Sequence, residues 1–155
     1  MKRKFFCLAC VVAISLLFTP RAHAAGTDNA ARAAIIVHLD TGAVLYEKNA
    51  DVRMYPASTT KILTTYLALL MGNLDDVVTT SATALQLEEK ASVIPLSEGE
   101  QLPLENLLYA TMVKSGNDGA NVIAETISGS IYAFAETMNQ YAASIGCTNT
   151  HFVNP

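Results

Sequence analysis

The hexapeptide Pro56-Ala57-Ser58-Thr59-Thr60-Lys61 runs directly into an apolar stretch of helical length, Ile62 to Leu70. This pattern predicts the start of a buried helix. Residues three apart on a helix lie on the same face, about 5–6 Å apart, so we expect Ser58 and Lys61 side by side at its first turn. The spacing brings a hydroxyl group within reach of an amine.

A serine at a helix start usually caps the helix by accepting a hydrogen bond from a free backbone N–H. Lys61 does not fit this simpler explanation, because the third residue after a cap is typically Glu or Gln and the helix N-terminus carries partial positive charge. Burial and the helix dipole both lower the pKa of a lysine from about 10.4. Lys61 is therefore a candidate general base for Ser58, and the amides of the same helix start can help to hold an oxyanion.

The N-terminus has the pattern of a secretory signal peptide. The basic residues Lys2 to Lys4 precede an apolar stretch of 14 residues from Phe5 to Phe18, and Ala22-His23-Ala24 follows as an A-x-A cleavage site. The apolar stretch is short for the ~20 residues that span a bilayer. We therefore predict a signal peptide over residues 1–24 and an exported protein, located in the periplasm or at the outer face of the cytoplasmic membrane or cell wall.

The residues after the predicted cleavage site are acidic. Residues 1–24 carry four of the ten basic residues and none of the fourteen acidic ones, so the remainder has a formal net charge of −8. This charge argues against nucleic acid as a partner and against electrostatic attachment to an anionic membrane. Cys147 is the one cysteine after residue 24, which excludes an intramolecular disulfide within these residues. We expect its thiol to be buried as a small apolar group.

The hydrophobic pattern predicts a mixture of strands and helices. Residues 33–39 place Ile35, Val37 and Leu39 on one face of a strand and Ala34, Ile36 and His38 on the other. A turn at residues 40–42 precedes residues 43–47, which predicts a β-hairpin. Apolar residues on both faces of its first strand predict that helices cover at least one side. Further helices are expected at residues 102–113, 120–127 and 131–145. The expected buried stripe of the first of these three consists of Leu104, Leu107, Leu108 and Met112.

The tripeptide Ser115-Gly116-Asn117 follows the expected helix at 102–113. It has a simple structural explanation, in which Gly116 takes the left-handed conformation at the helix end and Asn117 or Asp118 caps the next helix. Its occurrence together with Ser58 and Lys61 favours a catalytic role instead. Serine acyl-transfer enzymes without a histidine base combine Ser-x-x-Lys with a second serine that passes a proton and an asparagine that orients lysine and substrate.

This ordered series of motifs resembles the low-molecular-mass penicillin-binding proteins of the D-alanyl-D-alanine carboxypeptidase family. The resemblance covers nearly all of the chain after residue 24, and it rests on Pro56 to Lys61, Gly99-Glu100 ahead of Leu107 to Ala110, Ser115 to Asp118, Met138-Asn139, and Thr150 to Pro155. It implies the α+β fold shared by penicillin-binding proteins and serine β-lactamases. In that fold an antiparallel sheet flanked by helices adjoins a mostly helical lobe, and the active site lies between them.

By position, the resemblance implies a role for each candidate residue. Ser58 is the acylated nucleophile, Lys61 its general base, Ser115 the proton relay, and Asn117 the residue that orients Lys61 and the substrate. The implied reaction removes the terminal D-Ala from peptidoglycan stem peptides that end in D-Ala-D-Ala. It uses no metal and no other cofactor, and β-lactam antibiotics are expected as covalent inhibitors.

One family motif is missing. In the family, a Lys-Thr-Gly motif lies on a strand at the sheet edge, where it holds the substrate carboxylate and flanks the oxyanion hole. This motif does not occur in the 155 residues. We therefore expect residues 25–155 to be the N-terminal part of a catalytic domain, with the remaining strands and any C-terminal membrane anchor outside it. We also expect residues 25–155 alone to release no D-Ala, because the loss of one oxyanion donor already costs about a hundred- to a thousandfold in rate.

Three alternatives remain open from the sequence alone. A D,D-endopeptidase of the same family would cleave cross-links instead of stem-peptide ends. A serine β-lactamase needs a deacylating base, for which Glu98, Glu100 and Glu105 lie in the right region, although the first two are expected in a turn and Glu105 at a helix start. A truncated protein that binds peptidoglycan or a partner without turnover is the third.

Overall fold

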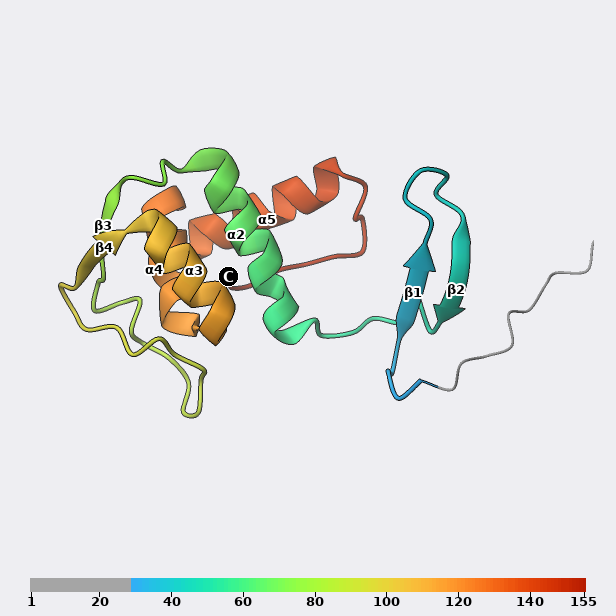
Figure 1. The fold of residues 1–155 in the computed structure, drawn as a ribbon, viewed down its shortest axis with the longest axis horizontal. Helices are drawn as coiled ribbons and strands as arrows, with labels where there is room; N and C mark the ends of the chain where they lie inside the picture. The colour runs from blue at the N-terminus through green and yellow to red at the C-terminus, as the bar shows by residue number, and fades with distance from the viewer. Residues whose placement is uncertain (1–28) are drawn as a thin grey trace, which may run out of the picture. The chain divides into compact units, whose positions relative to one another are not determined.

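A computed structural model describes residues 29–155 (Figure 1). The predicted signal peptide, residues 1–24, lies outside the described residues. The chain divides into two compact units between Met54 and Tyr55. No helix within residues 29–155 combines the length and the apolar character that a membrane span requires.

The first unit contains a β-hairpin, which confirms the prediction. Strand β1 (Ala34–Val37) pairs antiparallel with β2 (Val44–Lys48), and Gly42 supplies the left-handed conformation of the turn, with φ at 69°. No further strand pairs with this sheet in residues 29–155. Ile35 and Ile36 are 55% and 54% exposed. No helix lies in residues 29–54, so the expected helical cover over one side of the hairpin stays a prediction.

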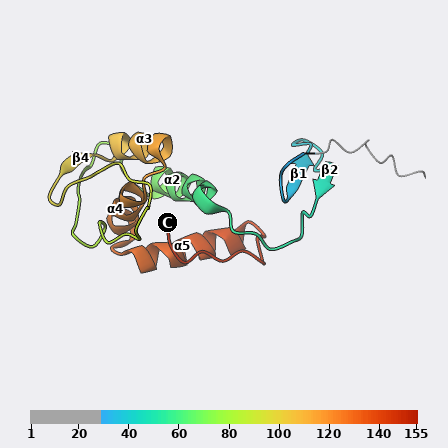
Figure 2. The same ribbon diagram turned by 90° about the horizontal axis from the view of Figure 1, so that it is seen from below.

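The second unit, residues 55–155, is mainly helical. Its elements in chain order are η1 (Ala57–Thr59), α2 (Thr60–Met71), β3 (Val77–Thr79), β4 (Gln101–Pro103), α3 (Leu104–Lys114), α4 (Asn117–Ser128) and α5 (Ile131–Ser144). Strands β3 and β4 form an antiparallel pair. In Figure 2, α2 and α4 lie between α3 on one side and α5 on the other, and α4 packs against each of these helices.

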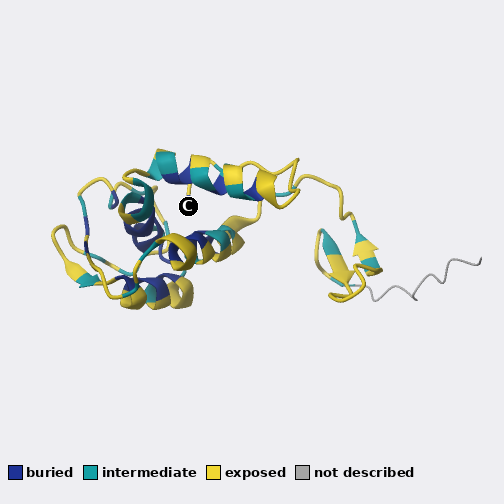
Figure 3. Cartoon of the chain, turned by 90° about the horizontal axis from the view of Figure 1, so that it is seen from above, coloured by how far each residue is buried: buried dark blue, intermediate teal, exposed yellow. Residues whose placement is uncertain are grey.

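The core of this unit is built around α4. Val122, Ile123 and Ala124 are at most 1% exposed, and the buried sides of the helices face one another in Figure 3. Apolar side chains from α2, α3 and α5 complete this core: Leu67, Ala68, Leu104, Leu107, Leu108, Phe134 and Met138. Burial of a side chain such as Leu or Phe contributes about 1.5–3 kcal/mol. The fixed position of α4 follows from this packing.

The predicted buried stripe on α3 was wrong at Met112. Thr111 is fully buried, whereas Met112 is 44% exposed. The reason is the close approach of α4, because a Cβ atom added to Gly119 would overlap the Thr111 hydroxyl. A small residue fits this contact and a methionine side chain does not. The helix also begins at Leu104 instead of 102, because Gln101–Pro103 pairs with β3.

Two further expectations need correction. Helix α4 begins at Asn117, earlier than the predicted 120, so the Ser115 to Asn117 turn joins α3 and α4 without a linker. Cys147 is exposed and not buried. It follows Gly146, whose φ of 90° ends α5, in a stretch that runs over the surface from Ala143 to His151.

The chain after α5 returns to the helices through side-chain to backbone hydrogen bonds. Asn139 of α5 makes two with Phe152: the Phe152 N–H donates to Oδ1 at 2.7 Å, and Nδ2 donates to the Phe152 carbonyl at 2.8 Å. The Thr64 hydroxyl of α2 donates to the Pro155 carbonyl at 2.9 Å in a buried contact. Two of the family-like segments, Met138-Asn139 and Thr150 to Pro155, are thus joined to each other.

The Asn139 contacts give a testable prediction for the intact protein. Asn139→Ala leaves the N–H and the carbonyl of Phe152 without partners, and each lost hydrogen bond of this kind costs about 1–3 kcal/mol. Denaturant unfolding should show a lower free energy of unfolding. The matched control is Gln140→Ala, an exposed neighbour on α5, which should stay within about 0.5 kcal/mol of the wild type. Equal stabilities for the two variants would contradict the role given to Asn139.

Candidate active site

The four candidate residues all belong to the helical unit. Ser58 lies in η1 and is exposed, while Lys61 lies in the first turn of α2 and is only 6% exposed. Ser115 is the C-cap residue directly after α3, and Asn117 begins α4. The first pair is therefore carried by the start of one core helix, and the second pair by the turn between two others.

A hydrogen bond joins these two parts of the sequence. Lys61 Nζ donates to Asn117 Oδ1 at 2.6 Å, across 56 residues of chain. The side chain of Asn117 consequently does not cap α4, whose N-cap residue is Gly116 without any side-chain cap bond. Nor does Asp118 act as the cap: its carboxylate accepts from Gly119 N–H and from a preceding loop. The simple capping explanation for this turn was wrong.

Lys61 sits in an environment that disfavours its charged form. Burial lowers the pKa of Lys61 below its usual 10.5, and the negative charge of Asp118 offsets part of this by raising it. Desolvation is the larger cause, as expected for an amine at the base of a core helix. The consequence is a lysine that more readily exists as a neutral amine, the form that can accept a proton.

Ser58 presents its hydroxyl on a strained turn. Neither η1 nor α2 has a side-chain cap bond at its start, so the simpler role of Ser58 as an N-cap is not found. Ala57, directly before it, has φ at 50°, a left-handed conformation that costs a non-glycine residue about 1–3 kcal/mol. No hydrogen bond joins Ser58 to Lys61 within the described residues. Strain beside an exposed hydroxyl is a feature found at functional sites.

Ser115, and not Gly116, takes the left-handed conformation at the end of α3. Its φ and ψ are 57° and 37°, whereas Gly116 has φ at −68°. Gly116 is needed for space instead, because a Cβ atom there would overlap the side chain of Ile94. The Ser115 hydroxyl is buried and makes no hydrogen bond within residues 29–155. Because its hydroxyl has no partner in this part of the chain, Ser115 can both donate and accept a proton. Leaving a buried hydroxyl unpaired costs about 1–3 kcal/mol.

The structure brings one further residue, Asp118, to the candidate site. Asp118 is 1% exposed, and its carboxylate accepts hydrogen bonds from the backbone N–H groups of Ile94, Leu96 and Gly119. From the sequence it was considered as a cap for α4 and as the last residue of the Ser115 to Asp118 motif, without a role of its own in the site. The available signal was an acid directly after the Ser-x-Asn motif at a helix start.

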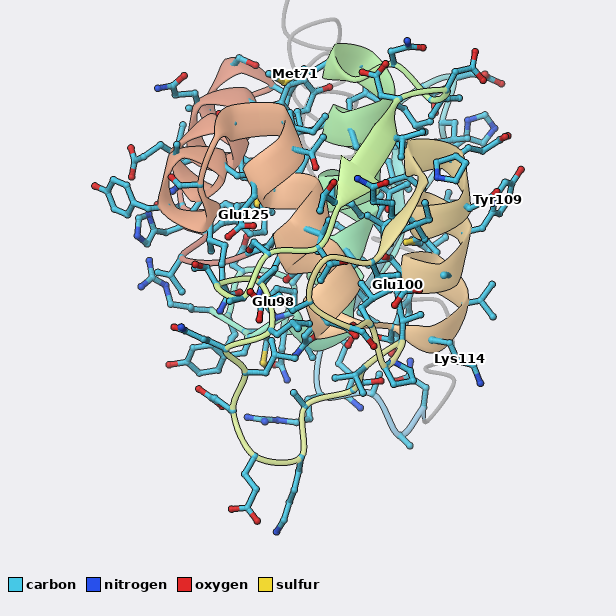
Figure 4. All side chains as sticks on the ribbon, turned by 90° about the vertical axis from the view of Figure 1, so that its left-hand side faces the viewer. Met71, Glu98, Glu100, Tyr109, Lys114 and Glu125 are labelled. Atoms are coloured by element: carbon cyan, nitrogen blue, oxygen red, sulfur yellow. The ribbon has the colours of Figure 1, made fainter. Side chains whose placement is uncertain are left out.

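The glutamates of the β-lactamase alternative make no hydrogen bond to the candidate residues within residues 29–155. Glu98 and Gly99 form a turn, and the Glu100 carboxylate accepts from the Ser97 N–H at 2.9 Å in the same turn (Figure 4). Glu105 lies in the first turn of α3 and lines a cavity of about 280 Å³ between α2 and α3. None of the three bonds to Lys61 or Asn117 within the described residues. The same part of the chain holds no cluster of three or more His, Cys, Asp or Glu side chains suited to a metal ion.

Comparison with known proteins identifies relatives in sequence. The family model described as D-alanyl-D-alanine carboxypeptidase matches residues 19–155. D-alanyl-D-alanine carboxypeptidase DacF of Bacillus subtilis (strain 168) is 40% identical over 132 residues, which cover 81% of this chain and 33% of the relative. DacA of Escherichia coli (strain K12) is 37% identical over 127 residues, which cover 76% and 32%. The chain spans about a third of the length of these curated relatives.

Solved structures give the same result. A D-alanyl-D-alanine carboxypeptidase from Mycobacterium tuberculosis H37Rv matches with a TM-score of 0.79 and 31% identity, over 88% of this chain and 50% of that one. Penicillin-binding protein 5 from Haemophilus influenzae matches with a TM-score of 0.74 and 36% identity, over 81% and 38%. These matches confirm the resemblance and the expected α+β fold. The chain belongs to the D-alanyl-D-alanine carboxypeptidase family of serine peptidases.

Proposed function

We propose that the intact protein is a serine-type D-Ala-D-Ala carboxypeptidase, which removes the terminal D-Ala from peptidoglycan stem peptides through an acyl-enzyme on Ser58. The observation that carries this proposal is the buried amine of Lys61, hydrogen-bonded at 2.6 Å to Asn117 of the second motif. The names of the relatives agree with it, since both are called D-alanyl-D-alanine carboxypeptidases.

In the acylation step, the neutral Lys61 amine takes the proton of the Ser58 hydroxyl. The serine oxygen attacks the carbonyl carbon of the peptide bond between the two D-Ala residues. A C–O bond forms, and the carbonyl electrons move to oxygen to give a tetrahedral oxyanion. Its collapse breaks the C–N bond. The departing D-Ala amine receives a proton from the Lys61 ammonium through Ser115, whose buried hydroxyl is free to accept one proton and donate another.

In the deacylation step, water attacks the ester carbonyl while Lys61 again accepts a proton. The C–O bond to Ser58 breaks, the serine oxygen takes the proton back, and the shortened peptide leaves with a new carboxyl group. Asn117 keeps the Lys61 amine in place through both steps by means of its side-chain oxygen. A lowered lysine pKa suits this cycle, because the same group must accept and return a proton near neutral pH.

We propose in addition that residues 1–24 direct export and are removed, and that residues 25–155 form part of a catalytic domain that works outside the cytoplasmic membrane. β-Lactam antibiotics are then covalent inhibitors, since they present a reactive carbonyl to the same serine. The endopeptidase alternative uses the same four residues on a cross-link. Assays of D-Ala release and of cross-link cleavage, run side by side on the intact protein, distinguish the two activities.

The position of Ser58 gives the first test. In the intact protein, a fluorescent penicillin should label Ser58 covalently, and Ser58→Ala should abolish the labelling while leaving the melting temperature close to that of the wild type. Peptide mass mapping locates the label. Ser144→Ala, which changes an exposed serine on α5, is the control and should label normally. Label on any other residue would refute the assignment of the nucleophile.

The environment of Lys61 gives the second test. Because burial lowers its pKa, the neutral fraction rises with pH through that lowered value. Acylation of the intact protein by the penicillin should therefore increase with pH through a midpoint below 10.5, the usual lysine value. Lys61→Arg should lose acylation, because a guanidinium group does not deprotonate in proteins.

The control for this variant is Lys114→Arg, at the exposed end of α3 (Figure 4). It makes the same chemical change outside the site and should keep both the rate and the pH profile. An arginine at position 61 that is acylated at the wild-type rate would show that Lys61 is not the base.

A further inference from the structure

Residues 92–96 run across the turn that carries Ser115 and Asn117. At one end of this segment, the Ser92 carbonyl accepts a hydrogen bond from the Asn117 N–H at 2.7 Å, and the Ser92 hydroxyl donates to the Lys114 carbonyl at 2.8 Å. The 92–96 segment therefore connects the end of α3 with the start of α4. The turn between these helices, residues 115–116, lies in the chain between the two residues that bond to Ser92.

Asp118 holds the rest of the segment. The Ile94 N–H donates to both of its carboxylate oxygens, at 2.9 and 3.0 Å, and the Leu96 N–H donates to Oδ2 at 3.1 Å. A third backbone N–H, from Gly119, donates to Oδ1 at 2.8 Å. An ionised carboxylate offers about four acceptor sites, so these amides nearly saturate it. They and the positive end of α4 compensate for its burial.

The side chain of Ile94 also packs tightly against the turn and the start of α4. A Cβ atom on Gly116 or on Gly119 would overlap the side chain of Ile94. The Ile94 side chain thus occupies space that two glycines of the turn and of α4 leave open. Since neither contact tolerates an added methyl group, the 92–96 segment and the start of α4 have little freedom to shift against each other.

We propose that Asp118 is a positioning residue: its buried carboxylate fastens the 92–96 segment to the start of α4 and thereby fixes Asn117 against Lys61. This inference rests on the proposed function. Asn117 is held at its N–H by Ser92 and at its side chain by Lys61. Release of the segment would free the first of these contacts and let the Asn117 amide move away from the lysine.

The charge of Asp118 has a second effect on the same lysine, because it raises the Lys61 pKa against the lowering effect of burial. The other charged groups on the helices packed against α2 and α4 are bonded to other partners or exposed. Glu125 of α4 accepts a hydrogen bond from Ser81 at 2.5 Å, Lys114 and Glu105 of α3 and Glu136 of α5 are exposed, and the first turn of α2 contains no acid. The 92–96 segment itself carries no charged side chain.

The test compares penicillin acylation of intact Asp118→Asn with the wild type over a range of pH. Asparagine keeps the shape of the side chain, removes the charge and replaces one acceptor oxygen by an NH2 group that cannot accept. The plateau rate should fall between about ten- and a hundredfold, the effect of a small displacement in a positioned site. The pH midpoint should move lower, because the charge that raises the Lys61 pKa is gone. Asp118→Glu restores the charge and should bring the midpoint back.

Two further variants separate position from charge. Ile94→Ala loosens the 92–96 segment without a change in charge, so the plateau rate should fall while the pH midpoint stays at the wild-type value. Glu125→Gln removes an acid from the same helix that does not affect Lys61, and it should change neither quantity. Because Ile94→Ala retains every backbone hydrogen bond, it remains informative if Asp118→Asn fails to fold.

The results that would overturn the proposal are specific. In one, Asp118→Asn lowers the melting temperature but, per acylatable molecule, keeps the wild-type plateau rate and pH midpoint, which is the behaviour of a merely structural residue. In the other, Ile94→Ala keeps the wild-type plateau rate. A wild-type protein that is not acylated at Ser58 would overturn the proposed function itself, a failure that is visible before any variant is examined.

Discussion

The hydrogen bond between the Lys61 amine and the Asn117 side chain is the contact around which the helical unit is arranged. Its two residues lie in the first turns of α2 and α4, and the 2.6 Å bond ties these two helix starts together. The packing of α4 against the other helices sets where Asn117 lies, and the burial of Lys61 in the first turn of α2 lowers its pKa. Core packing and chemistry are thus determined by the same two helix starts.

Most of the fold could be predicted from the sequence, because hydrophobic period and turn residues are local signals. The hairpin and the helices were expected close to where they lie. The errors arose where tertiary contact overrides local preference: Thr111 is buried in place of Met112 because α4 approaches through Gly119, and exposed Cys147 depends on the path of the chain after α5. The sequence contains no local sign of either contact.

The candidate site, too, could be predicted from the sequence only in part. Motif spacing suggested the residue types and their order, but not the conformation at Ser115, where a serine takes the left-handed form usually left to glycine. Nor could it reveal Asp118, because the partners of that carboxylate are backbone N–H groups on a loop more than 20 residues earlier. Every residue except proline carries a backbone N–H group, so a sequence pattern cannot show which of these groups will bind a given carboxylate.

The buried bond between Thr64 and Pro155 has a consequence for how the protein is made. It closes a loop of 91 residues between the second helical turn of α2 and the last residue of the chain described here, and loop closure of this kind carries an entropic cost that is met only when both ends are present. While the ribosome is still producing the segment after α5, α2 lacks this partner, and the Thr64 hydroxyl has only the long contact of 3.5 Å to the Thr60 carbonyl within its own helix. High sequence separation between contacting residues slows folding. The helical unit therefore completes this contact only after residue 155 has been synthesised, 91 residues after Thr64.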